Sequence, residues 1–287
     1  MQIEQMKTSK TGITLLVFGE SGAGKTTLFG TLPANELLLL EAEGGTAPLE
    51  GKNIDCVKIR EDLENLKDTF DSLVLPSTLK GYKHVGLDSS TELERFMQIR
   101  LASKSSNDGM PSLHDYGVVS FKMRDYMRRL RDLRDQGINV IVTALESPLE
   151  LEQTDDTTRT RLYPMLARKL APEVCGLFDV VAHMEISAKP GHEGERFLRL
   201  DGTEKIVAKN RWDRNHVMRF SVADLSVLFA KITELRAAIE EASNGNAPAT
   251  PPVETTVAPT EASAPTVDKP ATTKTSKKKG TANAVQS

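Results

Sequence analysis

The chain has 287 residues, 39% of them hydrophobic and 27% charged, which is typical of a globular protein with a substantial core. The formal net charge of −3 excludes a global electrostatic case for binding nucleic acid or a membrane surface, so any nucleic-acid site must be a local patch. Cys56 and Cys175 lie far apart without Cys or His neighbours, which fits a reducing compartment and gives no support to a zinc site. We expect a cytoplasmic protein, since the first residues lack an apolar signal core and no apolar run approaches membrane-spanning length.

Short apolar runs alternate with helical patterns along most of the chain. The apolar runs predict strands at residues 13–18, 36–40, 57–59, 84–87, 139–145 and 180–186, then a hairpin of 197–200 with 206–208 around Asp-Gly-Thr-Glu. Helical spacing predicts helices at residues 25–31, 61–73, 91–101, 116–136 and 222–243. This alternation predicts an α/β fold, with a mostly parallel twisted sheet covered by helices on both faces.

The composition changes sharply near residue 243. Residues 243–287 contain no Leu, Ile, Phe, Met, Trp or Tyr and are rich in Pro, Ala, Thr and Ser. Burial cannot offset the entropy of ordering such a segment, so we predict one domain at residues 1–242 and a disordered tail at 243–287. The basic end of the tail, KTSKKKG, is either solubilising or a tether to nucleic acid or a partner.

The most specific motif is GESGAGKTT at residues 19–27, placed where the first predicted strand meets the first predicted helix. It fits G-x-x-x-x-G-K-[ST], in which glycines let successive backbone N–H groups point at a phosphate beside a helix start. Lys25 would reach the β- and γ-phosphates of ATP, and Thr26 would hold Mg²⁺. The predicted nucleotide-binding residues are Gly19, Glu20, Ser21, Gly22, Ala23, Gly24, Lys25, Thr26 and Thr27.

Carboxylates follow two other predicted strands. In HVGLDSS, Asp88 ends an apolar run, where it would hold Mg²⁺ through water or, alternatively, cap the helix at 91–101. In NELLLLEAEGG, Glu41 and Glu43 end the strand after the phosphate loop. Either glutamate could polarise the water that attacks the γ-phosphate, and the alternative is an exposed loop residue.

Several stretches resemble elements of the RecA-family ATPases. LLEAEGG resembles the strand end with that family's catalytic glutamate, which implies this role for Glu43, and LDSS resembles its metal-binding aspartate followed by serine, at Asp88. KIVAKNRWD is similar to the strand end whose two cations reach a neighbouring subunit's γ-phosphate in RecA filaments. The resemblance implies catalytic roles for Lys209 and Arg211 and a homo-oligomer with ATP at its interfaces, whereas solvated cations at a hairpin end are the alternative. In the same subunit, the sequence suggests no cation near the phosphates other than Lys25.

Within that superfamily, the chain is most similar to short RecA-core ATPases encoded by phages, described as nucleotide-binding or single-strand-annealing recombination proteins. The likeness covers roughly residues 12–215 and includes HDYGVVSFKMRDYMRRL, VIVTALE and LFDVVAHM. In VIVTALE the family often has a polar sensor where Leu145 stands, flanked here by Thr143 and Glu146.

The resemblance also implies two mobile loops that hold single-stranded DNA. These correspond to residues 103–112 and 147–164, with Arg159 and Arg161 as phosphate contacts, although acidic residues in the second loop would repel phosphate. Between the two loops, one helix face carries arginines that are either a solvated face or a DNA contact, and the other carries a predicted buried stripe. The arginines are Arg124, Arg128, Arg131 and Arg134, and the stripe is Met123, Tyr126, Met127, Leu130 and Leu133.

The resulting prediction is a RecA-like, Mg²⁺-dependent ATPase that acts on single-stranded DNA in phage-type recombination or annealing. It would work in the host cytoplasm, with single-strand-binding or other recombination proteins as further partners and no membrane. One alternative is a small-molecule or nucleotide kinase with Arg159 and Arg161 in a lid, although Glu43 disfavours it, and a GTPase would need an N-K-x-D motif that the chain lacks. The other alternative is a nucleotide-gated scaffold for DNA-processing partners.

Overall fold

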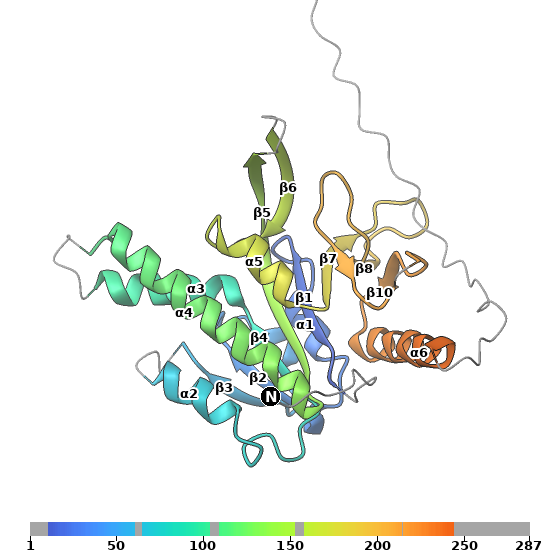
Figure 1. The fold of residues 1–287 in the computed structure, drawn as a ribbon, viewed down its shortest axis with the longest axis horizontal. Coiled ribbons are helices and arrows are strands. Elements are labelled where there is room, and N and C mark those ends of the chain that lie inside the picture. Colours follow the sequence, from blue (N-terminus) through green and yellow to red (C-terminus); the bar gives the residue numbers. More distant parts are fainter. Residues whose placement is uncertain (1–10, 61–64, 104–108, 153–157, 214, 244–287) are drawn as a thin grey trace, which may run out of the picture.

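A computed structural model describes residues 11–60, 65–103, 109–152, 158–213 and 215–243 (Figure 1). Apart from Ser243, the predicted disordered tail lies outside these residues. The same holds for residues 104–108 of the first predicted DNA loop, 153–157 of the second, and 61–64 at the start of a predicted helix.

The centre of the molecule is a sheet in the order β10-β8-β7-β1-β5-β4-β2-β3. All neighbouring pairs from β7 to β3 are parallel, whereas β8 and β10 extend the sheet as antiparallel strands. Two more strands pair antiparallel, β6 with β5 and β9 with β7. The strands are β1 (Thr14–Gly19), β2 (Leu37–Glu41), β3 (Asp55–Lys58), β4 (His84–Asp88), β5 (Asn139–Glu152), β6 (Thr158–Pro164), β7 (Val180–Ile186), β8 (Arg196–Arg199), β9 (Lys209–Asn210) and β10 (Phe220–Val222). The predicted α/β fold with a mostly parallel sheet is confirmed.

Helices cover both faces of the sheet because alternate residues of each strand point to opposite sides. Leu16 and Phe18 of β1 pack under α2, α3, α4 and α5, and Leu15 and Val17 pack under α1 and α6. The helices are α1 (Lys25–Phe29), α2 (Leu66–Leu73), α3 (Ser90–Ala102), α4 (Leu113–Asp132), α5 (Leu170–Leu177) and α6 (Leu225–Ser243), with short 3₁₀ turns η1 (Ala34–Glu36), η2 (Ala47–Leu49) and η3 (Leu133–Gln136).

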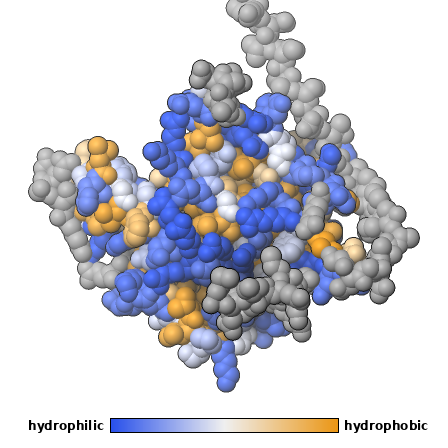
Figure 2. All heavy atoms as spheres, viewed as in Figure 1, coloured by the Kyte–Doolittle hydropathy of each residue, from blue (hydrophilic) through white to orange (hydrophobic). Residues whose placement is uncertain are grey.

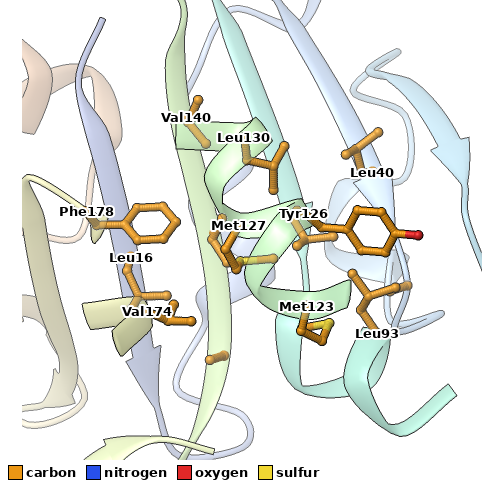
Figure 3. Close-up of a cluster of buried hydrophobic side chains, with 14 of the residues drawn as sticks. Leu16, Leu40, Leu93, Met123, Tyr126, Met127, Leu130, Val140, Val174 and Phe178 are labelled. Carbon is orange, nitrogen blue, oxygen red and sulfur yellow. The ribbon is translucent and has the colours of Figure 1, made fainter. Parts of the chain in front are cut away.

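The long helix α4 buries the apolar stripe that its sequence predicts. Met123, Tyr126, Met127, Leu130 and Leu133 are all at most 5% exposed, so this prediction is confirmed. Figure 3 shows Met123, Tyr126, Met127 and Leu130 between α4 and the strands, and the Tyr126 ring stacks on Phe70 of α2 with ring centroids 4.2 Å apart. The outer surface on this side is mostly hydrophilic, with scattered hydrophobic patches (Figure 2).

The predicted hairpin of residues 197–200 with 206–208 is wrong. β8 instead pairs with β7 on one side and β10 on the other, which buries Leu198 completely. Ile206 bridges to Leu162 of β6, and Thr203 closes the intervening turn by donating its N–H to the Ile206 carbonyl. Pairing with a buried central strand gives Leu198 more apolar contact than a local hairpin would.

The second predicted DNA loop is largely strand. β5 continues to Glu152 and pairs with β6 from Glu146↔Pro164 to Glu152↔Thr158, so this part of the prediction is also wrong. Leu149 and Leu151 are half-buried while Glu150 and Glu152 are exposed, which is the period-two alternation of a strand. In Figure 1 the β5–β6 hairpin stands out above the sheet.

Candidate functional site

The glycine-rich loop lies at the carboxyl edge of the central strand. β1 ends at Gly19, and α1 begins at Lys25 directly after the turn. Gly22 and Gly24 have φ of +79° and +104°, where a side chain would be strained, and a Cβ on Gly19 would lie 2.8 Å from the Met184 carbonyl oxygen. The three glycines of the motif are therefore required by the shape of the loop. Of the other predicted loop residues, Ala23 is buried, and Glu20, Ser21 and Thr27 are exposed.

Lys25 bends back over this loop. Its Nζ donates to the carbonyl oxygens of Gly19 at 3.0 Å and Glu20 at 2.7 Å. Burial lowers the pKa of the Lys25 ammonium, and the nearby carboxylates of Glu43, Asp88 and Glu146 oppose that shift. The ammonium is thus placed at the loop with negative charges around it.

The structure brings Thr26 and Asp88 into contact. The Thr26 hydroxyl donates to Asp88 Oδ2 at 2.7 Å, and Thr143 of β5 donates to Asp88 Oδ1 at 2.5 Å. Mg²⁺ prefers oxygen ligands of this kind, with phosphates and water completing its shell, so Thr26 and Asp88 fit the ion and would hold it. The alternative role of Asp88 as a helix cap is wrong, because Ser89 is the N-cap of α3 and accepts from the Glu92 N–H.

The two candidate glutamates differ in their surroundings. Glu41 is only 2% exposed, accepts from the Gly44 N–H and pairs with Arg60, with Nε and Oε2 3.5 Å apart. Glu43 is exposed as a residue, but its carboxyl group is partly buried. This partial burial and the charge of Asp88 raise its pKa, against a hydrogen bond from Ser89 and the charge of Lys25. Glu43 therefore lies among the loop residues, whereas Glu41 supports the turn that follows its strand.

A network of ionisable groups lies where β5 and β7 stop pairing with β1, and the sequence did not reveal it. His183 Nε2 is 2.6 Å from Glu146 Oε2, and His183 Nδ1 is 3.1 Å from Glu185 Oε1. Arg199 of β8 forms a two-point ion pair with Glu185. The polar group at the point where β5 stops pairing with β1 is thus Glu146, one residue after the position of the expected sensor.

The pKa values in this network are shifted by its hydrogen bonds. Burial alone would lower the pKa of His183, but its hydrogen bonds to Glu185 and Glu146 outweigh burial and raise it above 6.5. Burial would raise the pKa of Glu185, and its bonds to His183 and Arg199 outweigh burial and lower it. Both shifts favour the ionised forms in the folded protein.

Arg196 is a second cation at the phosphate loop of the same chain, so the expectation that Lys25 is alone there is wrong. Its Nε donates to the Ala23 carbonyl oxygen at 2.9 Å. These two residues are 173 positions apart, and only the placement of β8 beside β7 brings them together.

Lys209 and Arg211 do not lie at the phosphate loop of their own chain. β9 pairs with the amino-terminal half of β7, in the register Val180↔Asn210, away from the edge where β1 ends. Lys209 donates to the Gly176 carbonyl at 3.5 Å. Arg211 donates to the same carbonyl at 2.6 Å and to Asp179 Oδ1 at 3.2 Å. Their action on a neighbouring subunit stays a prediction.

The arginines proposed to contact DNA mostly have partners within the chain. Arg159 and Arg161 of β6 donate to the carbonyls of Glu204 and Ile206, at 3.3 and 2.7 Å. On the α4 side, Arg124 pairs with Glu173, Arg131 with Asp132 and Arg134 with Asp179, while Arg128 is exposed. Contact of these arginines with DNA stays a prediction.

The sequence matches the AAA domain family over residues 11–212, a range that includes the phosphate loop, Glu43 and Asp88. The chain belongs to the AAA domain family. This assignment supports an AAA-like P-loop ATPase that binds nucleotide. A search of curated proteins finds no match. Within the described residues, no helix has both the length and the apolar character needed to cross a membrane.

The network around His183 predicts a pH-dependent stability. Because the folded-state pKa of His183 is raised, its contribution is fully present below pH 6.5 and is lost as the pH rises through the folded-state value. We expect His183→Gln to lower the free energy of unfolding more at pH 6 than at pH 9, measured by urea denaturation. His114→Gln, at an exposed position of α4, is the control. Equal losses for His183→Gln at both pH values would contradict the prediction.

Proposed function

We propose that this protein binds ATP with Mg²⁺ and hydrolyses it to ADP and phosphate. The observation that carries the proposal is the convergence of Lys25, Thr26, Asp88 and Glu43 at one edge of the sheet, from α1 and the ends of β4 and β2, with the Thr26 hydroxyl on the Asp88 carboxylate. These are the groups that phosphoryl transfer from a P-loop nucleotide uses.

Each residue has a defined task in this proposal. The backbone N–H groups of the loop and the Lys25 ammonium bind the phosphates. Thr26 and Asp88 hold Mg²⁺, which supplies charge neutralisation when it is bound. The Glu43 carboxylate orients a water and accepts its proton, and a raised pKa suits a base that works near neutral pH.

We further propose that the ATPase acts on single-stranded DNA as an oligomer, in phage-type recombination or annealing in the host cytoplasm. The RecA-like motifs support this, as does the β5–β6 hairpin that extends from the edge where the phosphate loop lies. Lys209 and Arg211 would reach the ATP of a neighbouring subunit, and single-strand-binding or other recombination proteins would be further partners.

The alternatives have less support. A kinase lid would need mobile arginines, but Arg159 and Arg161 are bonded to backbone carbonyls of the 204–206 segment. Glu43 also disfavours a kinase, because transfer to an acceptor must avoid activating water. A nucleotide-gated scaffold would bind partners through the tail and hydrolyse ATP negligibly, so measured turnover separates it from the ATPase.

The two glutamates give a matched test of the hydrolytic residue. We expect Glu43→Gln to keep ATP binding and to lower turnover by on the order of 10²-fold or more, because a water-activating carboxylate is lost. Glu41→Gln should affect turnover less and thermal stability more, because Glu41 is buried against Gly44 and Arg60. The measurements are steady-state ATPase rate, ATP affinity and melting temperature. If the two variants behaved the other way round, the assignment of Glu43 would be wrong by two residues.

Single-stranded DNA should stimulate turnover. We expect a higher ATPase rate when an oligonucleotide is added, with duplex DNA of the same sequence as the control, and loss of turnover in Lys25→Ala. Turnover that is unaffected by DNA but depends on an added phosphate acceptor would favour the kinase.

Mixing two inactive variants tests whether subunits share the site. Lys209→Ala is preferred to Arg211→Ala, because Arg211 also pairs with Asp179 inside its own chain. Mixing Glu43→Gln with Lys209→Ala should restore part of the activity, since some interfaces then combine an intact Glu43 with an intact neighbouring Lys209. Full activity of Lys209→Ala alone, or a specific activity that does not change on dilution, would contradict an interfacial site.

A further inference from the structure

Arg196 approaches the phosphate loop from the antiparallel side of the sheet. It opens β8 opposite Ile186, near the end of β7, and therefore lies at the same edge as the end of β1. Because alternate residues of a strand share a face, Arg196 lies on the same side as Leu198, which packs in the cluster under α1 and α6. This is the face on which α1 begins, and Gly24 is the N-cap of α1.

The missing side chain of Gly24 makes room for the guanidinium. A Cβ on Gly24 would lie 2.9 Å from Arg196 Nε and 3.0 Å from its Cδ. Gly24 is also in the left-handed region, at φ +104°. The glycine that the loop needs for its turn thus also allows a cation to reach the loop backbone, where Arg196 Nε donates to Ala23 at 2.9 Å.

The charges around the loop are unevenly distributed. Glu43, Asp88 and Glu146 act on Lys25, and they come from β2, β4 and β5, on one side of the loop. Arg196 comes from β8, on the opposite side. A polyphosphate bound in the loop would therefore meet carboxylates near Lys25 and a guanidinium across from them.

The chemistry of Arg196 suits a phosphate ligand. Arginine carries five N–H donors, and the bond to Ala23 uses only the one on Nε. The planar guanidinium can donate two parallel hydrogen bonds to phosphate oxygens, and its side chain is exposed.

We infer that Arg196 is a nucleotide-binding residue of the same chain, which contacts the α- and β-phosphates of a nucleoside di- or triphosphate from the β8 side. The inference rests on the proposed function and adds a cation that does not depend on a neighbouring subunit. Asp88 and Glu43 lie on the other side of the loop and, with Thr26, serve the γ-phosphate, so Arg196 contributes to affinity and not to the chemical step.

Titration calorimetry with ATP and with ADP, both with Mg²⁺, tests this role. We expect Arg196→Ala to weaken both ligands by about tenfold or more, the scale of one lost charge-assisted hydrogen bond, with kcat at saturating ATP nearly unchanged. Arg219→Ala is the matched control, because it removes an exposed cation that lies opposite Leu200, at the far end of β8. Unchanged affinity in Arg196→Ala, or a loss confined to kcat, would overturn the inference.

Two further variants separate phosphate binding from a structural tie between Arg196 and Ala23. Arg196→Gln keeps an N–H donor for the Ala23 carbonyl but has no charge, and Arg196→Lys keeps the charge. We expect Arg196→Lys to retain most of the affinity for ATP and ADP, and Arg196→Gln to lose it. Rescue by Gln but not by Lys would overturn the inference, and this comparison holds even if the alanine variant does not fold.

Lys25→Ala distinguishes failure of the inference from failure of the proposed function. Unchanged ATP binding in Lys25→Ala would refute the nucleotide site as a whole. Lost binding in Lys25→Ala with normal binding in Arg196→Ala would refute the role of Arg196 alone.

Discussion

The buried carboxylate of Asp88 is the charge on which the arrangement of the site depends. It is 1% exposed, and burying an ionised carboxylate is costly unless hydrogen bonds compensate for the lost water. Thr26 and Thr143 donate to its two oxygens, and the Asp88 backbone carbonyl accepts from the N–H groups of Ala42 and Glu43. Because these donors belong to α1, β5 and the residues just after β2, one residue fixes the phosphate loop and the segment with Glu43 relative to each other.

The strand order gives this contact its geometry. β5 lies between β1 and β4, so the end of the loop strand and Asp88 are separated by two strand spacings, roughly 10 Å. Thr26 spans that gap from the first turn of α1 to reach one Asp88 oxygen, and Thr143 of the intervening strand β5 donates to the other. The backbone bonds to Ala42 and Glu43 then direct the chain after β2 toward the same edge.

The local features of the site could be predicted from the sequence, and the long-range ones could not. The loop at residues 19–27 and the strand ends at Glu43 and Asp88 are contiguous patterns, and the structure places them at one edge because parallel strands share their carboxyl ends. Arg196 gave no such signal, because its contact with Ala23 depends on β8 pairing with the preceding strand β7 rather than with residues 206–208, the partner predicted from the sequence. Likewise, Glu146 of β5 and His183 of β7 come together because these two strands pair with opposite sides of β1, which is known only once the strand order is known.

The prediction of secondary structure failed where the sequence did not show which residues would be buried. Residues 147–152 include Pro148, and the likeness to a RecA-type DNA loop predicted a loop there, yet the half-buried Leu149 and Leu151 hold them as a strand against β6. Helix α5 was missed because its sequence, LAPEVCGL, includes a proline and a glycine, although Leu170, Ala171 and Val174 are buried against the sheet.

The partners of the carboxylates near the loop indicate which of them is available for chemistry. Glu41 is bound to Arg60 and Gly44, Asp88 to two hydroxyls, and Glu146 to His183, and all three are buried or half-buried. Of these four residues at the edge of the sheet, Glu43 alone is exposed as a residue, although partial burial of its carboxyl group and repulsion from Asp88 raise its pKa. A carboxylate whose oxygens are held by fixed donors cannot turn to a water without breaking those bonds. The hydrogen-bond pattern therefore supports the proposed role of Glu43 as the water-activating carboxylate, on physical grounds that are independent of its likeness to the RecA motif.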